Sequence, residues 1–174
     1  MGVTRTTKSF GNEHYQLTPA VALTVLRPYE AGQIGVMLAS MDPWARYPVS
    51  AAELTSFFSA VEINAPRFAI RVAGVLEGAI AVKTNWFCGP YIQTFALSRN
   101  LQNQGIGSHI MAFVETQART AGDRNLWVAA SDFNTSAQRF YERHGYARVA
   151  EIDGLLRNNR TEILMRKPLF QKLP

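Results

Sequence analysis

The chain has 174 residues, of which 47% are hydrophobic and 11% aromatic, and its formal net charge is +5. This length and composition predict one globular domain and exclude a disordered or collagen-like chain. No apolar run approaches the roughly 20 residues that span a bilayer, so no membrane partner is expected. The single cysteine, Cys88, cannot form an intramolecular disulfide or, with three scattered histidines, a metal cluster. We therefore expect a cytoplasmic protein without a metal.

The positive charge is concentrated in the second half of the chain. Residues 1–98 carry seven basic and six acidic side chains, whereas residues 99–174 carry eleven basic and seven acidic ones. The basic residues stand singly and not in the clusters that nucleic-acid binding needs, so no nucleic acid is expected as a partner. A solvated basic face and a phosphorylated small-molecule ligand are the two interpretations left open.

The first half of the chain predicts a lead-in followed by strands and two helices. Residues 1–19 show no periodicity and are predicted to be a flexible lead-in, which leaves 20–174 as the single domain. Residue periodicity and β-rich runs predict a strand over 20–26, helices over 29–40 and from 51 onward, and strands over 68–72, 75–84 and 91–98. Ser50 and Glu53 fit a capping box at the start of the second helix.

The second half predicts two strand–helix units and a closing pair of strands. The expected elements are helices over 107–121 and 135–144 and strands over 126–130, 146–152 and 161–167. Gly122 and Gly145 stand where these helices should stop, and Thr135 with Gln138 fits another capping box. The whole predicts an α+β fold with a mixed sheet.

The stretch 102–108, which reads Gln-Asn-Gln-Gly-Ile-Gly-Ser, joins a predicted strand to a predicted helix. Glycines permit a tight turn, and backbone amides at the positive end of a helix can bind a phosphate without charged side chains. A P-loop would need Lys-Ser/Thr where Ser108 and His109 stand. A dinucleotide-binding loop would need a third glycine or alanine at Ile110. Both of these patterns therefore fail.

Two segments resemble the two signatures of the GNAT-type N-acetyltransferase superfamily, at the spacing that the family uses. The first is the strand end and loop over 96–107, which is similar to the acetyl-CoA signature Gln/Arg-x-x-Gly-x-Gly/Ala. The second reads Asn134-x-x-Ala137-x-x-Phe140-Tyr141-x-x-x-Gly145-Tyr146. The resemblance implies one domain with a twisted, mostly antiparallel sheet of six to seven strands. That sheet is splayed into a V and flanked by about four helices.

The resemblance also implies a reaction and the residues for it. Acetyl would pass directly from acetyl-CoA to a primary amine of a small molecule or peptide in a ternary complex, so Cys88 need not act as a nucleophile. Tyr141 is the implied general acid for the leaving thiolate, and the Leu97 amide is implied to stabilise the thioester carbonyl. The residues implied to bind acetyl-CoA are Ala96, Leu97, Gln102, Asn103, Gln104, Gly105, Ile106, Gly107, Ser108 and Asn134.

Several roles stay open at this point. Many family members carry a glutamate on the strand before the loop, where this chain has Gln93 and Thr94, so the general base is unassigned. Tyr141 could instead pack in the core, and Asn134 could only cap its helix. A catalytically inactive acyl-CoA-binding or regulatory module is the alternative function. Other titrating candidates for a proton-transfer role are Asp132, His109 and His144.

The acceptor side is defined least. The segment 41–44 and Tyr47 fall where relatives line the amine side of the cleft. Trp86, Phe87 and Tyr91 are expected to form an aromatic wall, which would contact a substrate or cover a homodimer interface. Asp42 and Glu62 could attract a cationic amine, but the sequence does not identify the acceptor.

Overall fold

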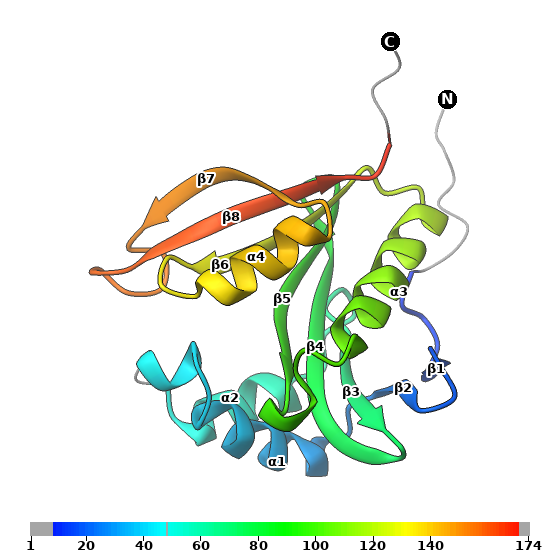
Figure 1. Ribbon diagram of the computed structural model, residues 1–174. Helices are drawn as coiled ribbons and strands as arrows, with labels where there is room; N and C mark the ends of the chain where they lie inside the picture. The colour runs from blue at the N-terminus through cyan, green and yellow to red at the C-terminus, as the bar shows by residue number, and fades with distance from the viewer. Residues whose placement is uncertain (1–8, 48, 171–174) are drawn as a thin grey trace.

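A computed structural model describes residues 9–47 and 49–170, which form eight strands and four α-helices (Figure 1). In chain order the elements are β1 (His14–Gln16), β2 (Val21–Val25), α1 (Pro28–Ala39), η1 (Trp44–Arg46), α2 (Ala51–Ser59), β3 (Arg67–Val72), β4 (Val75–Trp86), β5 (Gly89–Leu97), η2 (Arg99–Leu101), α3 (Ile106–Thr120), β6 (Asn125–Ser131), α4 (Thr135–Arg143), β7 (Ala147–Asp153) and β8 (Thr161–Pro168). The α+β class with a mixed sheet is confirmed.

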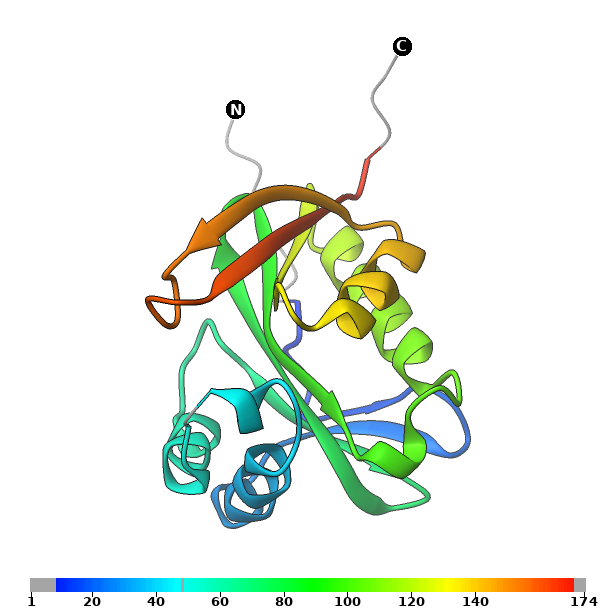
Figure 2. The same cartoon turned by 60° about the vertical axis from the view of Figure 1, so that its left-hand side comes forward.

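The eight strands form one sheet in the order β1-β2-β3-β4-β5-β6-β8-β7. Neighbouring strands are antiparallel except β5 and β6, which are parallel. β5 and β6 pair only at Tyr91–Trp127 and Ile92–Val128, after which the strands diverge. Figure 2 shows the resulting V, with β6, β8 and β7 in one arm and the rest of the sheet in the other. The expected splayed sheet is therefore present.

The sheet has one more strand than the six to seven expected, because part of the predicted lead-in is ordered. β1 pairs with β2, and Phe10 before it is only 5% exposed. The Phe10 and Tyr15 rings lie 6.0 and 4.6 Å from the Phe113 ring. Contacts between aromatic residues so far apart in the sequence produce no local periodicity, so this three-residue strand could not be predicted from the sequence. Residues 1–8 of that lead-in lie outside the described part of the chain.

One of the two predicted capping boxes is present and the other is wrong. Ser50 and Glu53 form the reciprocal bonds of the first box. The second helix, α4, is capped by Asn134, whose side chain accepts the Ala137 amide at 3.2 Å. Asn and Ser/Thr are both favoured N-caps, so adjacent candidates such as Asn134 and Thr135 compete in sequence, and backbone geometry decides between them.

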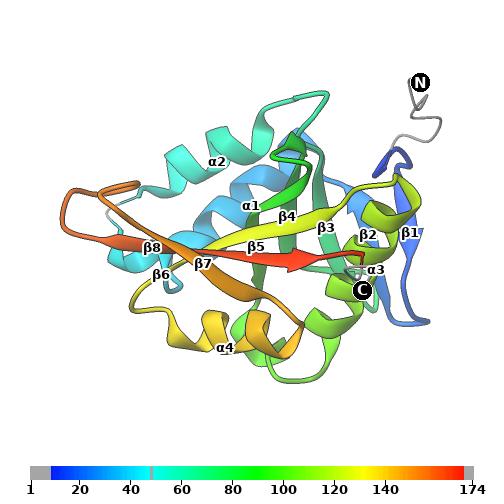
Figure 3. The ribbon, with the colours of Figure 1, turned by 90° about the horizontal axis from the view of Figure 1, so that it is seen from above.

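The helices cover both faces of the sheet and enclose two cores. Figure 3 shows α1 and α2 on one face and α3 and α4 on the other. One core cluster joins α3 to the strands through side chains such as Ile110, Val114 and Ile80, and the second joins α1 and α2 through Ile34, Leu38 and Phe58. No helix in residues 9–47 and 49–170 is long and apolar enough to cross a membrane.

Two glycines of α1 are expected to respond in opposite ways to alanine. A Cβ on Gly35 would lie 2.6 Å from the carbonyl oxygen of Ala51 on α2, whereas a Cβ on Gly32 would meet nothing within 4 Å. We expect Gly35→Ala to lower the free energy of unfolding by about 2 kcal/mol, since overpacking forces the helices apart. Gly32→Ala should raise it by about 0.5–1 kcal/mol. Urea unfolding of both variants checks this, and equal stabilities would contradict the close α1–α2 packing.

Candidate functional site

A pocket of about 430 Å³ lies between the end of β5, the start of α3, the inner side of α4 and the connection after α1. This volume is within the range of small-molecule sites. All the site residues expected from the sequence line it except Gln104 and Ile106. The Gln104 side chain turns away to donate to the Asn100 carbonyl at 2.7 Å, and Ile106 is buried in the core.

The loop before α3 exposes backbone amides toward this pocket. Gly105 is the N-cap of α3 with φ of +80°, a left-handed conformation that glycine adopts without penalty. The Ser108 and His109 amides turn back to the Gly105 carbonyl at 3.0 and 3.3 Å. The amides of Ile106 and Gly107, the first two residues of α3, have no acceptor within the helix and lie at its positive end. This geometry suits an anion.

The second glycine of the loop has a different role, which is close packing. A Cβ on Gly107 would lie 3.1 Å from two ring atoms of Phe140 on α4. Gly107 therefore lets the first turn of α3 approach α4. Phe140 also stacks on Phe95 at 6.0 Å, and both rings line the pocket. The two helix ends and β5 thus meet around one cavity.

The end of β5 presents Leu97 to the split between the arms of the sheet. Ser98 donates its amide to the Glu77 carbonyl on the β4 side. Because antiparallel strands alternate in bonding direction, the Leu97 amide and carbonyl point to the opposite edge, and those of Ala96 point to β4. The Gln102 side chain donates to this Leu97 carbonyl at 3.1 Å and ties the loop to the strand. The Leu97 amide remains on the open edge.

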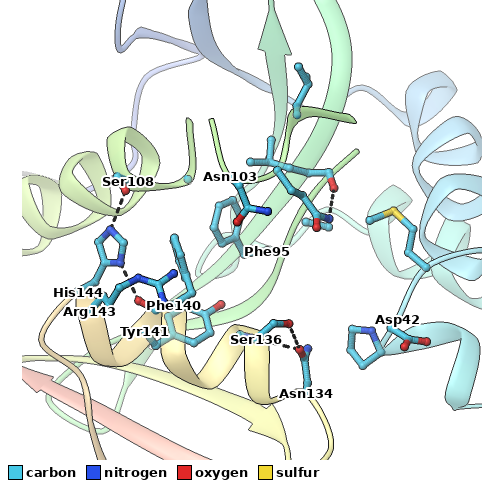
Figure 4. A pocket seen from close by; sticks show the side chains of 18 of the residues that line it. Asp42, Phe95, Asn103, Ser108, Asn134, Ser136, Phe140, Tyr141, Arg143 and His144 are labelled. Atoms are coloured by element: carbon cyan, nitrogen blue, oxygen red, sulfur yellow. Dashed lines mark hydrogen bonds between the residues drawn. The ribbon is translucent and has the colours of Figure 1, made fainter. Parts of the chain in front are cut away.

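Tyr141 on α4 lines the pocket and is only 6% exposed. Burial, and after it the nearby Tyr91, raises the pKa of the Tyr141 phenol well above its usual range. The phenol is therefore protonated at neutral pH and can act as a hydrogen-bond donor. Figure 4 shows the ring beside Phe140 in the pocket. Within the described residues no hydrogen bond engages the Tyr141 hydroxyl, so it is free for a ligand.

Asn134 both caps α4 and lines the pocket. Its Oδ1 accepts the Ala137 amide and the Ser136 hydroxyl, the latter at 3.0 Å. Because capping uses the oxygen, the amide nitrogen of Asn134 is left as a donor. Asn134 and Ser136 stand at the start of α4 and line the pocket together with Asp42 (Figure 4). The two expectations for Asn134, capping and lining, are therefore compatible.

A link between His144 and Ser108 was not predicted from the sequence. His144 Nδ1 lies 2.8 Å from the Phe140 carbonyl, and Nε2 lies 3.0 Å from Ser108 Oγ. A carbonyl only accepts, so Nδ1 carries the proton, and Nε2 of a neutral ring accepts the Ser108 hydroxyl. His144 thereby orients Ser108 at the start of α3. No local pattern connects two residues so far apart in the chain.

The acceptor-side expectations divide into two groups. Met41, Asp42, Pro43 and Trp44 line the pocket, and Asp42 pairs with Arg46 at 3.0 Å. The remaining residues do not line it. Trp86, Phe87 and Tyr91 gather around Trp127, Glu62 pairs with Arg67, and Tyr47 is buried elsewhere. A homodimer over the aromatic cluster stays a prediction.

Other polar candidates on the strands and loops have clear positions. Gln93 lies at a bulge of β5, and its buried Oε1 has no donor among the described residues. Asp132 Oδ1 accepts the Phe133 amide at 2.7 Å, and His109 is exposed on α3. Cys88 is an exposed free thiol in the β4–β5 turn, outside the pocket lining. In residues 9–47 and 49–170 no group of three His, Cys, Asp or Glu side chains is placed to hold a metal ion.

The fold agrees with comparison to known proteins. The model of the acetyltransferase (GNAT) family matches residues 35–146, so the chain belongs to this family of acyltransferases. An uncharacterised N-acetyltransferase from Lactobacillus delbrueckii subsp. lactis is 29% identical over 82 residues, which is 47% of each chain. The match thus spans about half the length of that curated relative.

Solved structures show the same fold. A candidate GNAT-family acetyltransferase from Desulfovibrio desulfuricans has a TM-score of 0.70 at 19% identity, covering 87% of this chain and 99% of that one. A Salmonella typhimurium acetyltransferase that modifies the N-terminal serine of ribosomal protein L7/L12 has a TM-score of 0.75 at 13% identity, covering 90% and 99%. At such low identities the likeness extends to the fold alone.

Proposed function

We propose that the chain transfers an acetyl group from acetyl-CoA directly to a primary amine of a small molecule or peptide, in a ternary complex in the cytoplasm. The observation that carries this proposal is one cavity that gathers the start of α3, the open edge of β5 and Tyr141. These are an anion site, a backbone edge and an acid. Acetyl transfer from a thioester that bears a pyrophosphate needs all three.

Acetyl-CoA would lie along the end of β5 and the start of α3. Amides of the loop 102–107 would bind the pyrophosphate, and the Ser108 hydroxyl would be an added donor once it turns from His144 Nε2 to the phosphate. The pantetheine amides would pair with the open edge of β5 at Leu97, like an added strand. This refines the sequence expectation, because the Ala96 amide faces β4 and its side chain contributes only to the wall. The Asn134 amide nitrogen would contact the same arm.

The chemistry follows from the two groups at the end of that arm. The Leu97 amide would stabilise the negative charge that grows on the thioester oxygen. Tyr141, whose phenol stays protonated, would donate its proton to the departing sulfur. No covalent enzyme intermediate is required, since the amine nitrogen attacks the thioester carbon directly.

The proposal is tested by binding and turnover measured separately. Calorimetric titration with acetyl-CoA should show binding, and thiol release should appear with one class from a panel of amino acids, polyamines, amino sugars and peptide N-termini. Binding without thiol release from any amine would favour an inactive acyl-CoA-binding module. Absence of binding would overturn the assignment of the site itself.

A further inference from the structure

Glu162 on β8 is a buried carboxylate that the site described above does not use. It is 3% exposed, and within residues 9–47 and 49–170 it belongs to no ion pair. Ile163 and Met165 are two positions apart on β8 and therefore share one face of the sheet, where both belong to the core cluster that contains α3. Because side chains alternate across a strand, Glu162 and Ile163 point to opposite faces, so Glu162 lies on the α1–α2 side. A carboxyl group buried there is costly unless it is hydrogen-bonded.

Hydrogen bonds hold this carboxylate in one orientation. Tyr47, in the connection after α1, donates its hydroxyl to Glu162 Oε1 and lies 2.8 Å from Ser131 Oγ. A phenol has one proton, so Ser131 is the donor in the second bond. Burial and then the bond to Glu162 raise the pKa of Tyr47 to about 12, which keeps this donor protonated. In the described part of the chain no donor reaches the second oxygen of Glu162, Oε2.

Glu162 lies on the arm of the V formed by β6, β8 and β7, outside the lining of the pocket. Its pairing partner on β6 is Ser131, beyond Val128, where β5 and β6 have already separated. Tyr91 stands at the first of the two rungs that join β5 to β6, one residue before the separation. Burial and then the charge of Glu162 raise the pKa of Tyr91, and the Tyr91 group in turn acts on Tyr141.

The charged groups around Glu162 favour a cation. Asp132 acts together with Glu162 on the Tyr47 phenol, and Asp42 lines the pocket at the other end of the same connection. The two nearby guanidinium groups are directed to a ring, since Arg46 and Arg160 stack on Phe133 at 4.9 and 5.0 Å. Asp42 is paired with Arg46, so within residues 9–47 and 49–170 the carboxylates on this side that belong to no ion pair are Glu162 and Asp132.

We propose that Glu162 accepts the proton of the acceptor ammonium, so that the acceptor is a cationic primary amine; this inference rests on the proposed acetyl transfer. The ammonium gives one proton to Glu162, which passes it to water. The free amine nitrogen then bonds to the thioester carbon and the carbon–sulfur bond breaks. Tyr141 gives its proton to sulfur and regains one from the nitrogen. The products are the amide, the thiol and one released proton.

Glu162→Gln tests this role, because it keeps the size of the side chain and an oxygen for Tyr47. With an alkylamine acceptor such as 2-phenylethylamine, kcat/KM at pH 7 should fall about 100-fold, while acetyl-CoA affinity stays as in the wild type. The kcat/KM of the variant should rise about tenfold for each unit of increasing pH, since only amine that solvent has deprotonated reacts. With O-methylhydroxylamine, which is uncharged at pH 7, the defect should largely vanish.

Two further variants make the outcome decisive. Glu162→Asp retains a carboxylate and should keep the wild-type pH profile at a lower rate, and Glu151→Gln, an exposed acid on the adjacent β7, should change nothing. A wild-type pH profile in Glu162→Gln, or a changed profile in Glu162→Asp, would overturn the role of Glu162 and leave acetyl transfer standing. If no amine of the panel supports thiol release by the wild type, the proposed function fails and this inference with it.

Discussion

Tyr141→Phe is expected to lower turnover about 100-fold or more while acetyl-CoA binds with unchanged affinity. The ring keeps its packing against Phe140 and Tyr146, so the pocket keeps its shape. Only the hydroxyl is lost, and with it the proton for the departing thiolate. Thiol release with the best acceptor of the amine panel measures the rate, and calorimetric titration measures the affinity.

Tyr146→Phe is the matched control for this variant. Tyr146 is also a buried tyrosine, its ring lies 5.5 Å from Tyr141, and its hydroxyl has no partner among the described residues. It does not line the proposed acetyl-CoA pocket. Tyr146→Phe should therefore leave turnover unchanged. An unaltered rate in Tyr141→Phe as well would show that Tyr141 only packs.

Gly105→Glu is expected to weaken acetyl-CoA binding by more than about 100-fold, because a carboxylate placed at the helix end would repel the pyrophosphate. A Cβ at Gly105 would meet no protein atom within 4 Å, so the space it enters is open toward the ligand. The positive φ of this residue adds a strain of roughly 1–2 kcal/mol to the free energy of folding. Calorimetric titration measures the affinity.

Gly122→Glu separates the effect on the ligand from the strain on the fold. Gly122 follows the other end of α3, has φ of +76°, and likewise has no atom within 4 Å of a Cβ. Gly122→Glu brings the same charge and a similar backbone penalty as Gly105→Glu. The free energy of unfolding of the variant should therefore fall by a similar amount, while its affinity for acetyl-CoA should stay as in the wild type. Loss of affinity in both variants, or in neither, would contradict the placement of the pyrophosphate at Gly105.

Local patterns predicted most of this fold. Apolar periodicity indicated α3, and β-rich runs indicated β3 to β6, because these signals depend on residues a few positions apart. The loop 102–108 was predicted as an anion site for the same reason, since Gly105 and the helix that follows it suffice. The two family signatures then brought Tyr141 and Leu97 into one hypothesis. Both residues line the pocket.

Other features could not be predicted because they depend on contacts between distant segments. β1 is ordered by aromatic packing on Phe113, nearly a hundred residues away. His144 reaches Ser108 only because Gly107 allows α3 to approach α4. The Asn134 cap was decided by backbone geometry at one of two adjacent candidates. In each case the residues give no signal until the elements are placed side by side.

The sequence by itself determined the class of fold, the loop proposed to bind an anion and the side chains that meet at the proposed acetyl-CoA site. The class of fold and the loop follow from short-range periodicity and backbone chemistry, whereas the side chains follow from the resemblance to the two family signatures. Only the tertiary structure decided the contact between Tyr47 and Glu162, which are 115 residues apart in the chain. That contact exists because β8 inserts between β6 and β7 and sets Glu162 beside Ser131. Strand order is fixed by the packing of the whole sheet, and no local stretch of sequence encodes it.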